Sequence, residues 1–128
     1  MRSLAALILM IGLLTVAVRA ETSSVGYPTV ASALEALQKR ADVRISRQGE
    51  WTIIEDRASL TLWSFTPERH PAHPAVVRRK IVEERGKLYV QMNVLCEAAK
   101  AACDNLVADF NKLNQQMADD LNRRKQAN

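Results

Sequence analysis

The sequence predicts an α+β domain: one helix, a five-stranded antiparallel β-meander and a long C-terminal helix, in that order. Apolar residues repeat every three to four positions at both ends of the domain and alternate with a period of two across its middle. Short turn sequences separate most of the alternating segments, which favours antiparallel neighbours. We therefore expect both helices to pack on one face of the sheet and to leave its other face uncovered.

The first helix is expected to start near Pro28 and Thr29. Pro28 suits the start of a helix, and Thr29 has a side chain that caps the first turn. An apolar stripe with helical spacing follows, formed by Val30, Leu34, Leu37 and Ala41.

Five strands are expected after this helix, at residues 43–46, 51–55, 60–66, 76–84 and 87–96. Gln48-Gly49 and Arg85-Gly86 supply tight turns. The third strand is apolar on both sides, as expected at the centre of a sheet. Residues 67–74 contain three prolines, which cannot continue a hydrogen-bonded ladder, and form the longest irregular connection.

The C-terminal helix is expected from Ala98 to Arg124. An apolar stripe with helical spacing runs along it, as expected for a helix that lies across a sheet. The stripe is formed by Ala99, Cys103, Leu106, Phe110, Leu113, Met117 and Leu121. Asp104 lies near its start and Lys125 near its end, which matches the helix dipole.

Residues 1–20 have the pattern of a cleaved secretory signal peptide. Arg2 precedes an apolar run over residues 4–18, and Val18-Arg19-Ala20 offers small residues before a cleavage site. The run is too short to span a bilayer comfortably as a helix. Residues 21–128 are then a single domain that is soluble and either periplasmic or secreted.

Charge does not favour nucleic acid as a partner. The chain has 18 Lys and Arg against 14 Asp and Glu; cleavage removes Arg2 and Arg19, which leaves 16 against 14 and a net charge of +2. That excess is too small to indicate nucleic acid or an anionic membrane. No second apolar segment approaches the length of a membrane span, and no cofactor motif is present.

Cys96 and Cys103 are expected to form a disulfide, because an exported chain meets an oxidising compartment. On one continuous helix their Cα atoms would lie ~10.5 Å apart, whereas a disulfide needs about 7 Å or less. Cys96 must therefore lie outside the helix that holds Cys103. A buried pair of free thiols is the alternative.

Five residues are candidates for binding. Trp63, Phe65 and Tyr89 would anchor a partner if they lie on the uncovered sheet face. Arg78 and Lys80 share one side of a strand and would form a basic patch there. Packing in the core explains the aromatic residues equally well, and a charged edge strand explains the basic pair.

His70 and His73 are the only histidines, and with Glu68 they could supply ligands to Zn²⁺ or Cu²⁺. A solvated surface loop is the simpler interpretation, because the prolines around the histidines hold the chain extended and do not force the imidazoles to converge. No nucleophile elbow, Cys/His cluster or glycine-rich phosphate loop is present. We therefore expect no catalytic activity.

Several segments resemble a group of small secreted proteobacterial proteins with no assigned activity. They are Gly26–Ala31, Trp51–Asp56, Leu62–Pro67, His70–Val76, Leu95-Cys96 and Ala102–Asp104. The resemblance covers nearly the whole domain and implies a periplasmic location and the disulfide. None of its motifs is a catalytic signature, so it implies no mechanism.

These observations predict a periplasmic binding or interaction protein that uses the exposed sheet face and the loop at residues 67–75. Its partner would be another exported protein or an envelope component, and a homodimer through the sheet face is also compatible. The alternative is a metal-binding protein with His70 and His73 as ligands.

Overall fold

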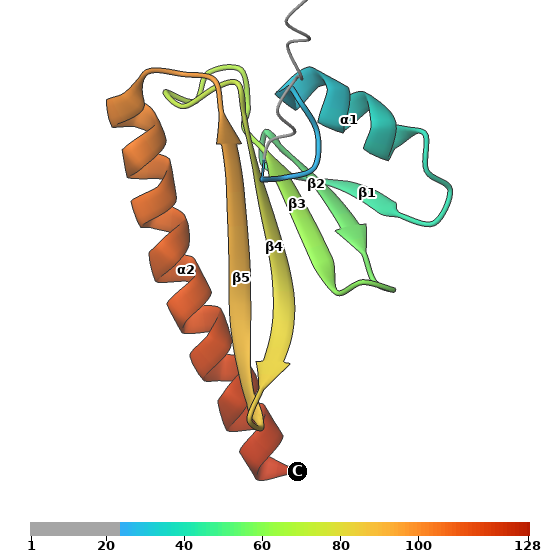
Figure 1. Ribbon diagram of the computed structural model, residues 1–128, viewed down its shortest axis with the longest axis vertical. Helices are drawn as coiled ribbons and strands as arrows, with labels where there is room; N and C mark the ends of the chain where they lie inside the picture. The colour runs from blue at the N-terminus through green and yellow to red at the C-terminus, as the bar shows by residue number, and fades with distance from the viewer. Residues whose placement is uncertain (1–23) are drawn as a thin grey trace, which may run out of the picture.

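The computed structural model describes residues 24–128, in which a sheet carries one helix on each side (Figure 1). The elements are α1 (Val30–Gln38), β1 (Arg44–Gln48), β2 (Trp51–Asp56), β3 (Thr61–Phe65), β4 (Ala75–Glu84), β5 (Lys87–Cys96) and α2 (Lys100–Ala127). The sheet has five antiparallel strands in the order β1-β2-β3-β4-β5. The predicted α+β class and meander are confirmed, while the expected signal peptide lies outside the described residues.

Helix α1 begins where the sequence predicts. The Thr29 hydroxyl accepts a hydrogen bond from the Ser32 N–H, and the Ser32 side chain accepts one from the Thr29 N–H. Glu97, just after β5, accepts a hydrogen bond from the Val30 N–H at 2.8 Å. The carboxylate thereby satisfies a free donor in the first turn and ties α1 to the end of β5.

The two helices cover opposite faces of the sheet, so the expectation that both pack on one face is wrong. Adjacent residues of a strand point to opposite faces, and both Val76 and Val77 are fully buried in β4. Val76 belongs to the core beneath α1, whereas Val77 belongs to the core beneath α2. A central strand that is apolar on both sides needs a helix on each, as Figure 1 shows.

Both ends of α2 are fastened to the sheet. The predicted disulfide is confirmed: Cys96 ends β5, Cys103 lies in the first turn of α2, and their Cα atoms are 5.8 Å apart. Near the other end, the Asn122 amide accepts from the Leu88 N–H and donates to the Leu88 carbonyl, both at 2.9 Å. Leu88 lies in the edge strand β5, so this amide occupies backbone groups that would otherwise be open to another strand.

The hairpin of β4 and β5 is the longest part of the sheet. Its turn has positive φ at both central residues, Arg85 and Gly86, as a two-residue hairpin turn of type I′ requires. The pairing with β3 reaches only Lys80, so the end of the hairpin extends beyond β3. No helix within residues 24–128 is both long and apolar enough to cross a membrane.

Candidate binding groove

The predicted binding residues share one face of the sheet, but α1 covers two of them. Trp63 pairs with Arg78 across β3 and β4 and therefore lies on the same face. Residues two apart on a strand also share a face, so Lys80 lies there too, as does Tyr89, which pairs with Val82. Trp63 is only 6 % exposed and Phe65 only 4 %. The condition for their role as partner anchors, exposure on an uncovered sheet face, is therefore not met, and packing in the core accounts for both.

The remaining members of that set are accessible to different degrees. Tyr89 is 46 % exposed, and Lys80 is half-buried. The Arg78 guanidinium lies 5.5 Å from the centre of the Trp63 ring and donates a hydrogen bond of 3.4 Å to Asn93. Arg78 thus contributes to the packing around Trp63, which leaves Tyr89 as the exposed aromatic of this face.

The loop histidines do not assemble a metal centre with Glu68. Nδ1 of His70 accepts a hydrogen bond from the Ala72 N–H at 3.0 Å, and Nδ1 of His73 lies 3.2 Å from both oxygens of Thr66. Within residues 24–128, no group of three or more His, Cys, Asp or Glu side chains is arranged to hold a metal ion. The three-ligand arrangement considered from the sequence is therefore absent from the described residues.

The opposite face carries a feature that the sequence interpretation missed. Beside α2 lies a hollow of about 380 Å³ with mostly apolar walls, which we call the Arg79 groove. Its lining residues are Glu55, Asp56, Arg57, Leu60, Thr61, Leu62, Arg79, Ile81, Val90 and Met117. The volume lies within the ~300–1,000 Å³ typical of small-molecule sites.

Arg79 is a partly buried cation without a carboxylate partner. Its Nε is buried and has no hydrogen-bond acceptor. Its guanidinium lies 4.9 Å from the centre of the Phe110 ring, and it takes part in none of the ion pairs formed within residues 24–128. Burial lowers the pKa of Arg79 from its ordinary value, because desolvation disfavours the charged form.

Leu60 forms part of the groove in a strained conformation. Its φ is +53°, a region that costs an L-residue about 1–2 kcal/mol. Its side chain is nevertheless 58 % exposed, while its carbonyl accepts a hydrogen bond from the Ile81 N–H at 3.1 Å. The fold therefore holds an apolar side chain at the groove without gaining much from its burial.

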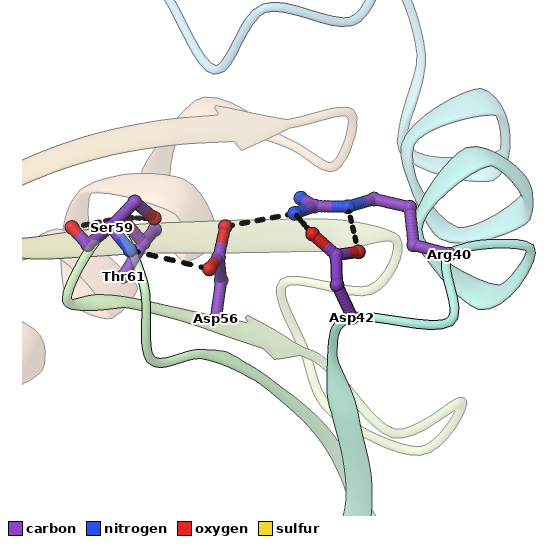
Figure 2. Close-up of polar contacts among 5 residues, drawn as sticks. All are labelled: Arg40, Asp42, Asp56, Ser59 and Thr61. Atoms are coloured by element: carbon purple, nitrogen blue, oxygen red, sulfur yellow. Dashed lines mark hydrogen bonds and ion pairs between the residues drawn. The ribbon is translucent and has the colours of Figure 1, made fainter.

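A polar network fixes the turn that presents Leu60 (Figure 2). The Arg40 guanidinium donates to Asp56 at 3.0 Å and to both carboxylate oxygens of Asp42. The second oxygen of Asp56 accepts from the Ser59 N–H at 3.3 Å, and the Ser59 hydroxyl donates to Thr61 at 2.9 Å. These contacts join the end of α1 to the β2–β3 turn.

The same contacts depress the pKa of both carboxyls. Hydrogen bonds from Ser59, followed by those from Arg40, lower the pKa of Asp56, although burial opposes this. The hydrogen bonds from Arg40 lower the pKa of Asp42. Both carboxylates are therefore stabilised in their ionised form, which suits a structural role in holding the β2–β3 turn against the end of α1.

Acid should remove the contribution of Asp56 to stability. Its folded-state pKa lies below the ordinary value of 3.8; the stabilisation is complete above the unfolded-state pKa and is lost as the pH falls through the folded-state pKa. We expect Asp56→Asn to lower the free energy of unfolding at neutral pH by on the order of 1–2 kcal/mol. It should also flatten the dependence of that free energy on pH below about 4.

Urea denaturation across an acidic pH series measures this effect. Asp109→Asn is the matched control, because Asp109 is exposed and joins no ion pair among the described residues. It should retain the slope of the unmodified protein. An unchanged slope in Asp56→Asn would contradict the assigned role.

One sequence signal pointed towards Arg79. Val77, Arg79 and Ile81 lie on the same side of β4, so the alternation places a single charge within an otherwise apolar row. The position of Leu60 gave no comparable signal, because its left-handed backbone depends on the contacts of Asp56 and Ser59. The residues that frame the groove come from four strands (β2, β3, β4 and β5), the β2–β3 turn and α2.

A larger hollow of about 650 Å³ lies between β5 and α2. Polar side chains of α2 line much of it, and Asn122 among them is already bonded to Leu88. The Arg79 groove combines an apolar wall with an unpaired cation, which makes it the stronger candidate for a binding site.

Comparisons with known proteins assign no family to this fold or groove. No protein-family model matches the chain, and searches of curated proteins and of solved structures found no significant similarity.

Proposed function

We propose that this chain is an exported, non-catalytic binding protein that takes an apolar ligand into the Arg79 groove. The observation that carries the proposal is Leu60, an exposed leucine kept in a strained conformation at the wall of an apolar hollow. Strained residues persist where the surrounding structure enforces them, and they cluster at ligand sites.

The backbone strain of Leu60 and the exposure of its side chain support a role in binding. Glycine or asparagine would adopt the same backbone with less strain, and an exposed leucine gives up most of the free energy that its burial would provide. A ligand lying against Leu60, Leu62 and Met117 would recover that free energy on binding. Leu60 would then lower the free energy of the complex, although it raises the free energy of the unbound protein.

The groove offers little for catalysis. Its lining residues include no histidine or cysteine, and its carboxylates are engaged with arginines: Glu55 with Arg57, and Asp56 with Arg40. General acid–base or nucleophilic chemistry needs such groups free and within reach of one another. Binding without reaction is the function that this set of side chains supports best.

The disulfide supports location in an oxidising compartment. Together with the signal pattern of residues 1–20, it favours the periplasm or the extracellular medium. The resemblance to small secreted proteobacterial proteins agrees with this location. An exported partner or a homodimer that uses the face around Tyr89 stays a separate prediction.

Replacing Leu60 by glycine tests the proposal. Relief of the left-handed strain is worth about 1–2 kcal/mol, and the added freedom of the unfolded chain offsets ~0.4–1 kcal/mol of this. Stability should therefore be unchanged or rise by up to about 1.5 kcal/mol. Binding of decanol, followed by heteronuclear NMR, should weaken about tenfold because an apolar contact is lost.

Arg85→Gly is the matched control. Arg85 has nearly the same positive φ, +52° against +53° for Leu60, but lies in the β4–β5 turn and does not line the groove. It should change stability in the same direction and leave the affinity for decanol unaltered. The proposal is wrong if decanol does not shift resonances of groove residues, or if Leu60→Gly binds decanol as tightly as the unmodified protein.

A further inference from the structure

We infer that the ligand of the Arg79 groove is an amphiphile with a single carboxylate, whose head group pairs with the Arg79 guanidinium. This inference rests on the proposed function of the groove and specifies the chemical class of its ligand. The supporting observation is that the Arg79 guanidinium, beside the apolar wall of the groove, has no carboxylate partner and a buried Nε without an acceptor.

Neighbouring carboxylates do not neutralise Arg79. In the row across the sheet, Glu55 pairs with Leu62, and Leu62 pairs with Arg79. Two strand spacings, or roughly 9–10 Å, therefore separate the Glu55 and Arg79 backbones. Glu55 instead contacts Arg57 at 3.1 Å, so its charge is already paired.

Asp56 is directed away from Arg79. It follows Glu55 in β2 and therefore points to the opposite face of the sheet, where Arg40 binds it at 3.0 Å. On the face that holds the groove, Glu83 contacts Lys125 of α2. Arg79 is thus the one cation lining the groove, within the described residues, that has no carboxylate partner.

The guanidinium needs an acceptor that the protein does not supply. Phe110 contacts it through the ring, whereas Nε is buried with an unused N–H. Carboxylates bind guanidinium groups through two parallel hydrogen bonds, and a rotation of the Arg79 side chain that uncovers Nε would let Nε and one Nη satisfy that geometry together. A ligand carboxylate would remove the unsatisfied donor and the unpaired charge in one contact.

The rest of the groove fits an apolar body. Beyond Arg79, the wall is formed chiefly by Leu60, Leu62, Ile81, Val90 and Met117. The only other cation there, Arg57, is paired with Glu55, so a second anionic group on the ligand would find no free partner. The hollow of about 380 Å³ suits a medium-length hydrocarbon chain rather than a large ring system.

Three ten-carbon probes test the head-group preference by calorimetric titration: decanoate, decanol and decyltrimethylammonium. Decanoate should bind at least tenfold more tightly than decanol, and the cationic probe should bind most weakly. Equal affinities for decanoate and decanol would overturn the inference but leave an apolar binding site. Failure of all three probes would overturn the proposed function as well.

Substitution of Arg79 separates charge recognition from apolar binding. Arg79→Met should reduce the decanoate affinity to that for decanol without changing decanol binding. Arg79→Lys keeps the charge but loses the paired geometry, so its decanoate affinity should be intermediate; this variant serves if Arg79→Met does not fold. Wild-type decanoate affinity in both variants would overturn the inference.

Lys112→Met is the matched control, because Lys112 is exposed on α2, joins no ion pair among the described residues and does not line the groove. It should leave the decanoate affinity unchanged, and an equal loss in Lys112→Met and Arg79→Met would indicate a general charge effect and overturn the inference. Binding of an acidic peptide by a protein that does not bind decanoate would assign the groove to a protein partner and also overturn it.

Discussion

Trp63→Ala should remove a large part of the free energy that keeps the protein folded. The ring is 6 % exposed within the core beneath α1, and it contacts the Tyr27 ring edge-on at a centroid distance of 5.8 Å. Removing a buried tryptophan typically costs ~3–5 kcal/mol. The free energy of unfolding of a domain this size is only about 5–15 kcal/mol, so this one substitution removes a large fraction of it.

Circular dichroism during urea denaturation measures the loss. Tyr89→Ala is the control, because Tyr89 is an aromatic residue on the same sheet face that is 46 % exposed. It should change the free energy of unfolding by less than ~0.5 kcal/mol. If Trp63→Ala instead retained wild-type stability, the packing assigned to α1 would be wrong and Trp63 would again be a candidate surface anchor.

Replacing both cysteines by alanine should cost about 2–3 kcal/mol, the usual contribution of a small disulfide loop. The bond fixes the end of β5 to the first turn of α2, and Leu106 and Phe110 lie in the following turns of that helix. Without the bond, these core side chains are held by packing alone. The transition temperature should fall by on the order of 10 °C in a domain of this length.

Reduction supplies an independent control for the disulfide. Thermal unfolding with and without dithiothreitol should shift the unmodified protein towards the Cys96→Ala/Cys103→Ala variant and leave the variant unchanged. If the variant and the oxidised protein unfolded at the same temperature, the bond would contribute little to stability, and the packing of Leu106 and Phe110 would suffice to hold α2.

The elements themselves were predictable because their signals are local. Thr29 and Ser32 cap α1 through groups three residues apart, and Arg85-Gly86 supports the β4–β5 turn through its own backbone preferences. The requirement that Cys96 lie outside the helix of Cys103 followed from the rise of a helix and is confirmed. Each inference needed only residues close in the chain.

The candidate site was less predictable because it depends on contacts between distant segments. The sequence correctly placed Trp63 and Phe65 on one side of β3, but not the helix that covers that side. It also separated Arg79 from Arg78 and Lys80 by alternation, without revealing which of them lacks a partner. Pairing of charges depends on the strands and helices that pack together, which periodicity does not specify.

By itself, the sequence determined the type and order of the elements and the antiparallel meander, because backbone geometry and local hydrogen bonding dictate these. It favoured the disulfide because an exported chain meets an oxidising compartment. The tertiary structure decided which helix lies on which face, and with it which side chains are core and which are accessible. It buried Trp63 beneath α1 and left Arg79 beside an apolar hollow at α2. The physical reason is that burial and electrostatic pairing belong to the packed assembly of all the elements and not to any one of them.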